Sequence, residues 1–233
     1  MLATSFVLAS LASVAAAAPN SKVHQHSRRF NSDNWCGAVL TYSGINSVEA
    51  TWTVPTISIP PNGDAGAHYS EYEWIGMGGT SACSATGDLL QAGTGAEITN
   101  GDVTYYAYYQ LFGSSGPMIN TNLAATSSTD GTFYWENHTT GESSTMALQS
   151  NQGHSICTES VEWINERPGD PGNRRPFPDF TNFSFSGISA ATYDGSTVNL
   201  DGAEDWILYR DQTPEILCHP SRTSSTSMDI LRG

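Results

Sequence analysis

Strict alternation of apolar and polar residues is the feature that most restricts how this chain can fold. Between Ser47 and Pro55 every second residue is apolar: Val48, Ala50, Trp52 and Val54. A period of two places these side chains on one face of a β-strand. No window of helical length shows a convincing 3.6-residue apolar period, so the pattern indicates a chain built from strands.

Further segments are predicted to be strands because they are rich in β-branched and aromatic residues or alternate in polarity. They are Trp35–Ser43, Glu71–Gly76, Asp88–Gly93, Val103–Phe112, Gly131–Asn137, Ser144–Leu148, Val161–Glu166, Phe180–Ile188 and Asp205–Tyr209. Turns rich in Gly, Ser, Asn and Pro separate them. Many short strands at close spacing favour an all-β fold, either an antiparallel sandwich or a barrel. About 200 residues beyond the N-terminal region suffice for one domain with an adequate core.

The two ends of the chain differ from the patterned middle. Residues 1–18 are an apolar run that ends in consecutive alanines, which predicts a signal peptide and a secreted, extracellular protein. Residues 19–29 are basic and end in Arg28-Arg29, which indicates either a cleaved pro-segment or a disordered tail. We expect one β-sandwich domain over residues 30–219 and a flexible, Ser/Thr-rich tail over residues 220–233.

Acidic residues dominate the predicted domain. After Arg29 no lysine occurs, and six arginines stand against all 23 acidic residues, a net charge of −17. Such a surface repels nucleic acid and anionic membranes, so neither is expected as a partner. We expect a soluble monomer, and the acidity suits an acidic medium because repulsion between the carboxylates falls with pH.

The cysteines and histidines limit the chemistry that is available. Four cysteines are an even set, which predicts disulfides in a secreted protein. No Cys-x-x-Cys pair occurs and the histidines beyond Arg29 are scattered, so no metal site and no cofactor are expected. The sequons at Asn137 and Asn182 predict N-glycosylation in a eukaryotic host.

Two carboxylates lie on the strand predicted over Val161–Glu166. Alternation puts Glu162, Ile164 and Glu166 on one face. A carboxylate at the end of a mostly apolar strand is either a solvated edge residue or an acid held in a site. The signatures Gly-x-Ser-x-Gly, His-Glu-x-x-His and Asp-Thr/Ser-Gly are absent. An enzyme with this sequence would therefore work with carboxylates, amides and aromatic rings.

Two other strands carry candidate site residues. Gln91 faces away from its apolar neighbours in the strand over Asp88–Gly93, and it is either a solvated polar residue or a neutral donor to a developing oxyanion. Tyr106, Tyr108 and Gln110 share one face of the strand over Val103–Phe112. An aromatic strip of this kind is either core or a platform that binds a peptide or a sugar.

Five motifs in one order together resemble a known family. They are Asn34-Trp35, Val48–Pro55, Trp74-Ile75-Gly76, Leu89-Leu90-Gln91-Ala92-Gly93 and Glu162-Trp163-Ile164-Asn165-Glu166. The series is similar to that of the eqolisins, the glutamic endopeptidases that filamentous fungi secrete. The resemblance extends from about Asn34 to Leu200, most of the chain that follows the basic segment.

The resemblance implies a β-sandwich of concanavalin-like or jelly-roll type, with a concave face that binds a peptide or protein substrate. It implies a catalytic dyad of Gln91 and Glu166, with Glu166 rather than Glu162 as the acting carboxylate. It also places Trp74 in the cleft, and we expect Tyr106, Tyr108 and Gln110 on the aromatic face to contact substrate together with Trp74. A disulfide between Cys83 and Cys157 is also implied, which leaves Cys36 and Cys218 as the second pair. On this basis the chain is expected to be an acid-acting endopeptidase.

Departures from the family pattern keep other functions open. Gly78 stands where the family usually has an acid, and Gln110 lies in a strand that tends to carry acid and tryptophan. A secreted binding protein with impaired catalysis is therefore an alternative. A sugar-binding protein or glycosidase is a further one, but Glu162 and Glu166 lie about 13 Å apart along one strand. That is too far for the two carboxyls of a glycosidase.

Overall fold

The computed structural model describes residues 27–83, 87–111, 114–117, 122–126, 129–149, 155–211 and 213–233. Every regular element among them is a β-strand, which confirms the predicted fold class. The predicted signal peptide and most of the basic segment lie outside the described residues. In the part of the chain that is described, no helix is long and apolar enough to cross a membrane.

The strands follow one another along the chain as β1 to β22. Their bounds are β1 Arg29–Ser32, β2 Trp35–Thr41, β3 Ile45–Thr51, β4 Ile57–Ser58, β5 Tyr69–Met77, β6 Gly87–Asp88, β7 Leu90–Thr99, β8 Asp102–Leu111, β9 Ser114–Pro117, β10 Asn122–Ala125, β11 Asp130–Asn137, β12 Glu142–Gln149, β13 Ser155–Ile156, β14 Ser160–Glu166, β15 Gly169–Asp170, β16 Asn173–Arg174, β17 Asp179–Phe180, β18 Phe183–Thr192, β19 Thr197–Val198, β20 Glu204–Tyr209, β21 Ile216–Ser224 and β22 Ser227–Arg232. Each strand predicted from the sequence is present, with ends that differ by a few residues.

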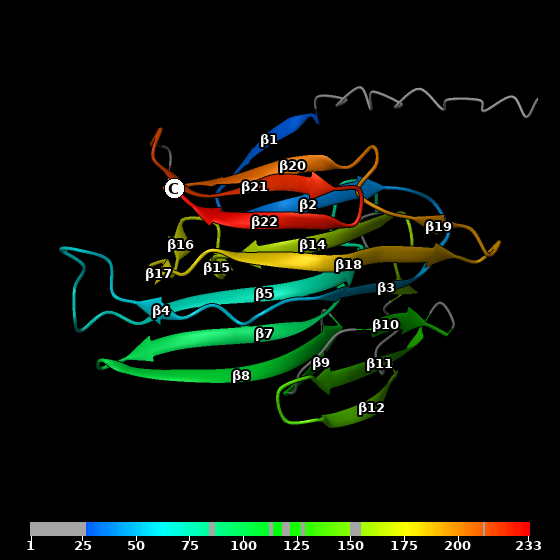
Figure 1. Cartoon of the computed structure of the whole chain (residues 1–233), viewed down its shortest axis with the longest axis horizontal. Coiled ribbons are helices and arrows are strands. Elements are labelled where there is room, and N and C mark those ends of the chain that lie inside the picture. The colour runs from blue at the N-terminus through cyan, green and yellow to red at the C-terminus, as the bar shows by residue number, and fades with distance from the viewer. Residues whose placement is uncertain are drawn as a thin grey trace, which may run out of the picture.

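Most of these strands join in one long sheet that curls over itself (Figure 1). Its order is β12-β11-β10-β3-β18-β22-β21-β20-β2-β14-β5-β7-β8-β9, and neighbouring strands on this path are antiparallel. The half from β12 to β21 packs on the half from β20 to β9, because β3 contacts both β5 and β14. The indole of Trp163 in β14 spans the two layers and donates to the carbonyl of Glu49 in β3 at 3.2 Å.

The core lies between the two halves of the sheet. Alternation along β14 sends Val161, Trp163 and Asn165 into it and leaves Glu162, Ile164 and Glu166 on the other face. Large side chains with almost no exposure fill the core, among them Trp163, Phe133, Phe185, Ile45, Ile75 and Met77. Disulfides join Cys36 to Cys218 and Cys83 to Cys157, the pairing that the family resemblance implies.

The prediction of a flexible tail over residues 220–233 is wrong. These residues belong to β21 and β22, an antiparallel hairpin that is inserted between β18 and β20 in the long sheet. Met228 and Ile230 alternate with Asp229, and both apolar side chains are fully buried. Only two apolar residues carry this alternation, which is why the Ser/Thr-rich composition hid the strand.

A cluster of polar side chains is buried in the core directly behind the strand that carries Glu166. Glu71 and Glu73 of β5 are fully buried, as is Asn165 of β14, which pairs with Glu73 in the strand register. Thr94 donates to Glu73 at 2.5 Å and accepts from the indole of Trp52 at 2.9 Å. Burial, followed by the nearness of Glu73, raises the pKa of Glu71 well above its ordinary value, and burial raises that of Glu73. Both groups are therefore neutral acids in the folded protein at acidic pH.

The hairpin at the C-terminus should be essential for stability. Ile230→Ala removes a fully buried side chain from β22 and is expected to lower the free energy of unfolding by about 2–5 kcal/mol. Ile216→Ala, at a position that is 37% exposed, is the matched control and should cost much less. Urea unfolding measures both variants, and an equally small effect of the two would mean that the hairpin does not contribute to the core.

The acid pair should make the fold most stable in acid. A carboxyl whose pKa is raised on folding contributes its full stability below the unfolded value of about 4.5, and this contribution falls as the pH rises toward the folded pKa. Glu73→Gln mimics the neutral form of the side chain. As the pH rises from 4 to 7.5, the free energy of unfolding of the variant should therefore fall by roughly 1–3 kcal/mol less than that of the wild type. Glu142→Gln, on the surface, is the control. An unchanged pH dependence in Glu73→Gln would contradict this assignment.

Candidate active site

The candidate residues lie on the face of the sheet that points away from the core, across strands β20, β2, β14, β5, β7 and β8. We call this the site face. Residues that pair directly in the register share a face, so three rows cross it. The rows are Trp35–Glu166–Tyr72, then Gly37–Ile164–Trp74–Gly93–Tyr108, then Val39–Glu162–Gly76–Gln91–Gln110. The structure therefore brings all the sequence-predicted site residues to one face.

Glu166 is held by its aromatic neighbours at the end of β14. Its Oε2 accepts a hydrogen bond from the indole N–H of Trp74 at 2.8 Å. Burial raises the pKa of Glu166 to about 7, while the hydrogen bond from Trp74 and the positive charge of Arg174 pull it down. A carboxyl with this pKa changes protonation state at modest cost, as a group that both takes and returns a proton requires.

Gln91 is 6% exposed and is oriented by Gln110 on the neighbouring strand. The side-chain amide of Gln91 donates to the carbonyl oxygen of Gln110 at 2.9 Å, and the two residues are directly opposite in the register. An amide has two N–H donors, so one remains for another acceptor. Gln110, predicted to contact substrate, thus fixes the rotation of the Gln91 amide.

The two members of the predicted dyad lie on one face of the sheet but are not adjacent in the register. Gln91 lies two strands away from β14, and Glu166 lies four residues along β14 from the row of Gln91. The offsets are about 10 Å across the strands and about 13 Å along them. Trp74 lies in the row between the two, and its hydrogen bond draws the carboxylate of Glu166 toward that row.

Glu162 also lies on the site face, and the sequence did not predict that it is buried. It is fully buried, shares the row of Gln91, and neither carboxyl oxygen has a hydrogen-bond partner in the described structure. Burial raises the pKa of Glu162 well above its ordinary value, so it is a neutral acid at acidic pH. The even spacing of Glu162 and Glu166 correctly placed both side chains on one face. The burial of Glu162 depends on the neighbouring strands, so the sequence of β14 alone does not indicate it.

Glycine makes room for the indole of Trp74. A Cβ on Gly93, its partner in β7, would lie 1.9 Å from the carbonyl oxygen of Glu73 and 2.6 Å from the Cβ of Trp74. A Cβ on Gly76 would lie 2.8 Å from the Trp74 ring. Gly76 is therefore required for the close approach of this ring to the sheet, and Gly93 for the close approach of β5 and β7 at Trp74. Gly78, where the family usually has an acid, has a φ of +89°, a conformation that favours glycine.

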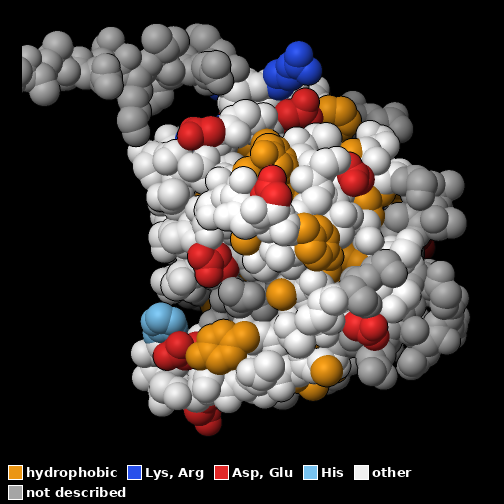
Figure 2. Space-filling model, turned by 90° about the vertical axis from the view of Figure 1, so that its right-hand side faces the viewer, with side chains coloured by type: hydrophobic (Ala, Val, Ile, Leu, Met, Phe, Trp, Pro, Cys, Tyr) orange, Lys and Arg blue, Asp and Glu red, His pale blue; other side chains and the backbone are white. Residues whose placement is uncertain are grey.

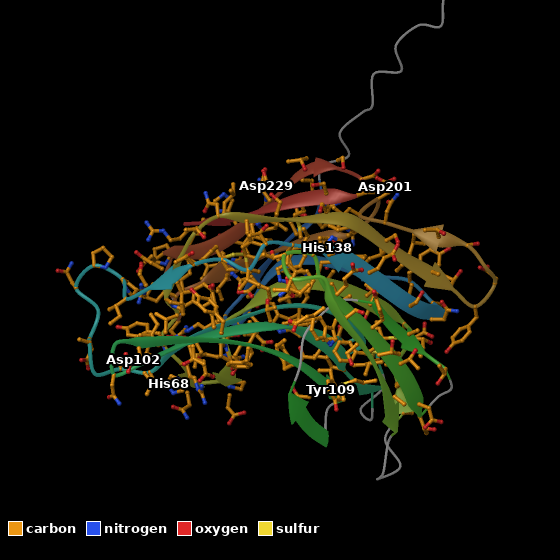
Figure 3. The ribbon with its side chains drawn as sticks, turned by 60° about the horizontal axis from the view of Figure 1, so that its bottom comes forward. His68, Asp102, Tyr109, His138, Asp201 and Asp229 are labelled. Carbon is orange, nitrogen blue, oxygen red and sulfur yellow. A yellow bond between two sulfur atoms is a disulfide. The ribbon has the colours of Figure 1, made fainter. Side chains whose placement is uncertain are left out.

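The tyrosines continue the face beyond Glu166. Tyr72 pairs with Glu166 in the register and packs on Tyr108 with a centroid distance of 5.3 Å. The hydroxyls of Tyr72 and Tyr106 both donate to Glu97, at 3.2 and 2.8 Å. The face ends at His68, which contacts Glu97 at 3.0 Å and lies near the β7–β8 turn that carries Asp102 (Figure 3). Tyr106 thus belongs to this Glu97 cluster, and Tyr108 lies closer to the dyad.

Within the described residues, no group of three or more His, Cys, Asp and Glu side chains could hold a metal ion. The chemistry that the face offers is an acid–base carboxyl at Glu166 and an amide donor at Gln91. Aromatic surface from Trp35, Trp74 and Tyr108 surrounds these two groups. A carboxyl and an oriented amide on one apolar face suit water attack on a polarised carbonyl.

Known proteins resemble this chain over most of its length. The model of the peptidase A4 family matches residues 33–231. Aspergillopepsin-2 of Aspergillus niger is 30% identical over 192 residues, 72% of this chain and 67% of the relative. Scytalidopepsin B of Scytalidium lignicola is 31% identical over 189 residues, 73% of this chain and 68% of the relative.

Solved structures show the same architecture. Scytalido-glutamic peptidase with a transition state analog inhibitor superposes with a TM-score of 0.69 and 26% identity, over 86% of this chain and 98% of that one. The eqolisin SCP-B in complex with the tripeptide Ala-Ile-His gives a TM-score of 0.67 and 27% identity over the same shares. The chain therefore belongs to the peptidase A4 family, the eqolisins, and is a glutamic endopeptidase.

Proposed function

We propose that Glu166 and Gln91 are the catalytic dyad of this peptidase. Ionised Glu166 takes a proton from a water whose oxygen attacks the carbonyl carbon of the scissile peptide bond. The amide of Gln91 donates to the oxyanion that forms, and this donor stabilises the tetrahedral intermediate more than the substrate. Glu166 then returns the proton to the leaving nitrogen as the carbon–nitrogen bond breaks. The observation that carries the proposal is Glu166 held by the Trp74 indole on the face that also presents Gln91.

The site face supplies the contacts for a peptide. Tyr106 and Tyr108 are partly exposed and offer aromatic surface on this face, while Trp74 is fully buried beside Glu166. A tripeptide is bound in the structure of one relative. Tyr108 presents a buried hydroxyl with no described partner, and burial, followed by the charge of Glu166, raises its pKa. A neutral hydroxyl of this kind is a donor for a main-chain carbonyl of the substrate.

We propose that the protein acts in acid. Its buried carboxyls Glu71, Glu73 and Glu162 are all neutral there, so the fold is most stable at acidic pH. Because the pKa of Glu166 is about 7, most of the free protein then carries a protonated Glu166. The reactive form is the ionised minority, which the Trp74 hydrogen bond and the charge of Arg174 favour.

We infer a secreted, processed and glycosylated protein from the sequence features that the fold leaves accessible. The dibasic pair Arg28-Arg29 directly precedes the body of the sheet, where Arg29 is the exposed first residue of β1. Asn137 ends β11 at an exposed turn, and Asn182 lies exposed before β18. Acidic side chains are spread over the face shown in Figure 2, which favours a monomer in solution and disfavours polyanions.

Variants of the dyad test the mechanism. Glu166→Gln should lower kcat/KM for a denatured protein or peptide substrate by about 10²–10⁴-fold, because no side chain then takes the proton. Gln91→Ala should lower it by about 10²–10³-fold through loss of the oxyanion donor. Cleavage is followed between about pH 2 and 6 with pepstatin present, to exclude a contaminating aspartic protease.

Glu162→Gln is the matched control, since it preserves the shape of a buried neutral acid on the same strand and face. It should keep most of the activity. Loss of cleavage in Glu162→Gln with retention in Glu166→Gln, both folded, would transfer the catalytic role to Glu162. A folded wild type that cleaves nothing but binds peptides would make the protein a non-catalytic relative.

The charge of Arg174 should set the activity of the protein in acid. Arg174→Gln removes a cation that lowers the pKa of Glu166, so the pKa rises and the ionised fraction falls. Below that pKa, kcat/KM should drop severalfold, because a pKa one unit higher leaves about a tenth of the ionised form. At higher pH the kcat/KM values of the variant and the wild type should converge. Arg175→Gln, at the neighbouring position, is the control. It should leave the rise of kcat/KM with pH where it is in the wild type. A uniform loss at every pH in Arg174→Gln would instead indicate a structural role.

A further inference from the structure

A pocket of about 550 Å³ opens at the edge of the sheet next to the site face. Its lining includes Phe30, Asn34, Trp206, Tyr209 and Pro214. Strand β1 runs parallel to β20, and the register pairs Phe30 with Trp206. The size is within the range of pockets that bind small ligands or single side chains.

A continuous line of aromatic rings joins this pocket to the catalytic carboxyl. Phe30 stacks on Trp206 with ring centroids 4.3 Å apart. Trp206 lies 5.4 Å from Trp35, and Trp35 lies 5.2 Å from Trp74, whose indole donates to Glu166. The pocket therefore lies against the same aromatic cluster as Glu166, and the rings of Trp35 and Trp74 within that cluster are buried.

The lining suits a neutral, apolar occupant. Phe30 is 47% exposed although its ring is large and apolar. Trp206, Tyr209 and Pro214 add further apolar surface to the lining. Asp33, the acidic residue in the wall, pairs with Arg174 at 3.2 Å, so its charge is already compensated and does not call for a cation.

The spacing of the strands places the pocket within reach of a bound peptide. Three strand spacings separate β1 from β14, which is about 14 Å at roughly 4.8 Å each. An extended chain advances about 3.3 Å per residue. A peptide that follows the aromatic line from Glu166 therefore reaches Phe30 after about four residues.

We propose that this pocket is a specificity subsite that binds an aromatic or large apolar side chain of the substrate, about four residues from the cleaved bond. The inference rests on the function proposed above, because Glu166 fixes where that bond lies. Phe30 and Trp206, which stack on each other, present one aromatic surface against which the side chain packs.

Peptides that share one cleavable core and carry Phe or Gly at the fourth residue on either side test this subsite. Wild-type kcat/KM should favour Phe over Gly by about tenfold on one side. This ratio should fall toward unity in Phe30→Ala and persist in Phe30→Tyr. Tyr193→Ala, an exposed aromatic residue that does not line the pocket, should leave the ratio unchanged.

Binding separates the subsite from the chemistry. Calorimetry with Glu166→Gln protein should show the same preference for the Phe peptide in Kd, and Phe30→Ala added to it should remove that preference. If the wild type cleaves nothing, this pair of results upholds the subsite while the proposed reaction fails. Two outcomes would overturn the subsite. One is a Phe-to-Gly ratio of kcat/KM near unity on both sides of the cleaved bond. The other is a preference for Phe that survives Phe30→Ala in a protein whose thermal unfolding is unchanged.

Discussion

Burial of β14 on both faces is the constraint on which the rest of the structure depends. The strand is hydrogen-bonded to β2 on one side and β5 on the other, and every residue from Ser160 to Asn165 is buried. A shift of one residue would turn Trp163 out of the core and move Glu162 and Glu166 into it. The register of β14 is therefore strongly specified, and with it the position of Glu166, the proposed catalytic carboxyl. Trp163 also bonds across the layers to Glu49, so the strand that positions Glu166 is the one that ties the two halves together.

Four carboxyls surround this strand, and burial acts on all of them in the same direction. Glu71 and Glu73 lie behind it in the core, and Glu162 and Glu166 lie on the site face. Burial raises each pKa, so neutralisation in acid stabilises the fold. The same shift opposes catalysis, since a protonated Glu166 takes no proton from water. Among the four carboxyls, only Glu166 has its pKa lowered by Arg174 and the Trp74 indole. The other three can therefore stabilise the fold as neutral acids while Glu166 remains easier to ionise.

The strands and the family were predictable from the sequence because their signals lie within short segments of the chain. Alternation identified the strands, and the order of five motifs identified the family and a dyad whose members do reach one face. The hairpin of β21 and β22 was missed, because only Met228 and Ile230 mark it and its partners β18 and β20 are distant in the chain. The bond between Gln91 and Gln110 and the burial of Glu162 were missed for the same reason. Both arise from register between strands, which no single segment encodes.

The row through Trp74 shows how register also builds specificity. Along it, Trp206 pairs with Gly37, and Trp74 pairs with Gly93 on the neighbouring strand. A Cβ on Gly37 would lie 2.1 Å from the carbonyl oxygen of Trp163, and one on Gly93 would meet β5. Glycine at these two positions therefore allows a closer approach of the neighbouring strand than a side chain would. Beyond Trp206 the row ends at Phe30, one residue after the dibasic pair. A cleavage after Arg29 would place the new N-terminus at the wall of the pocket.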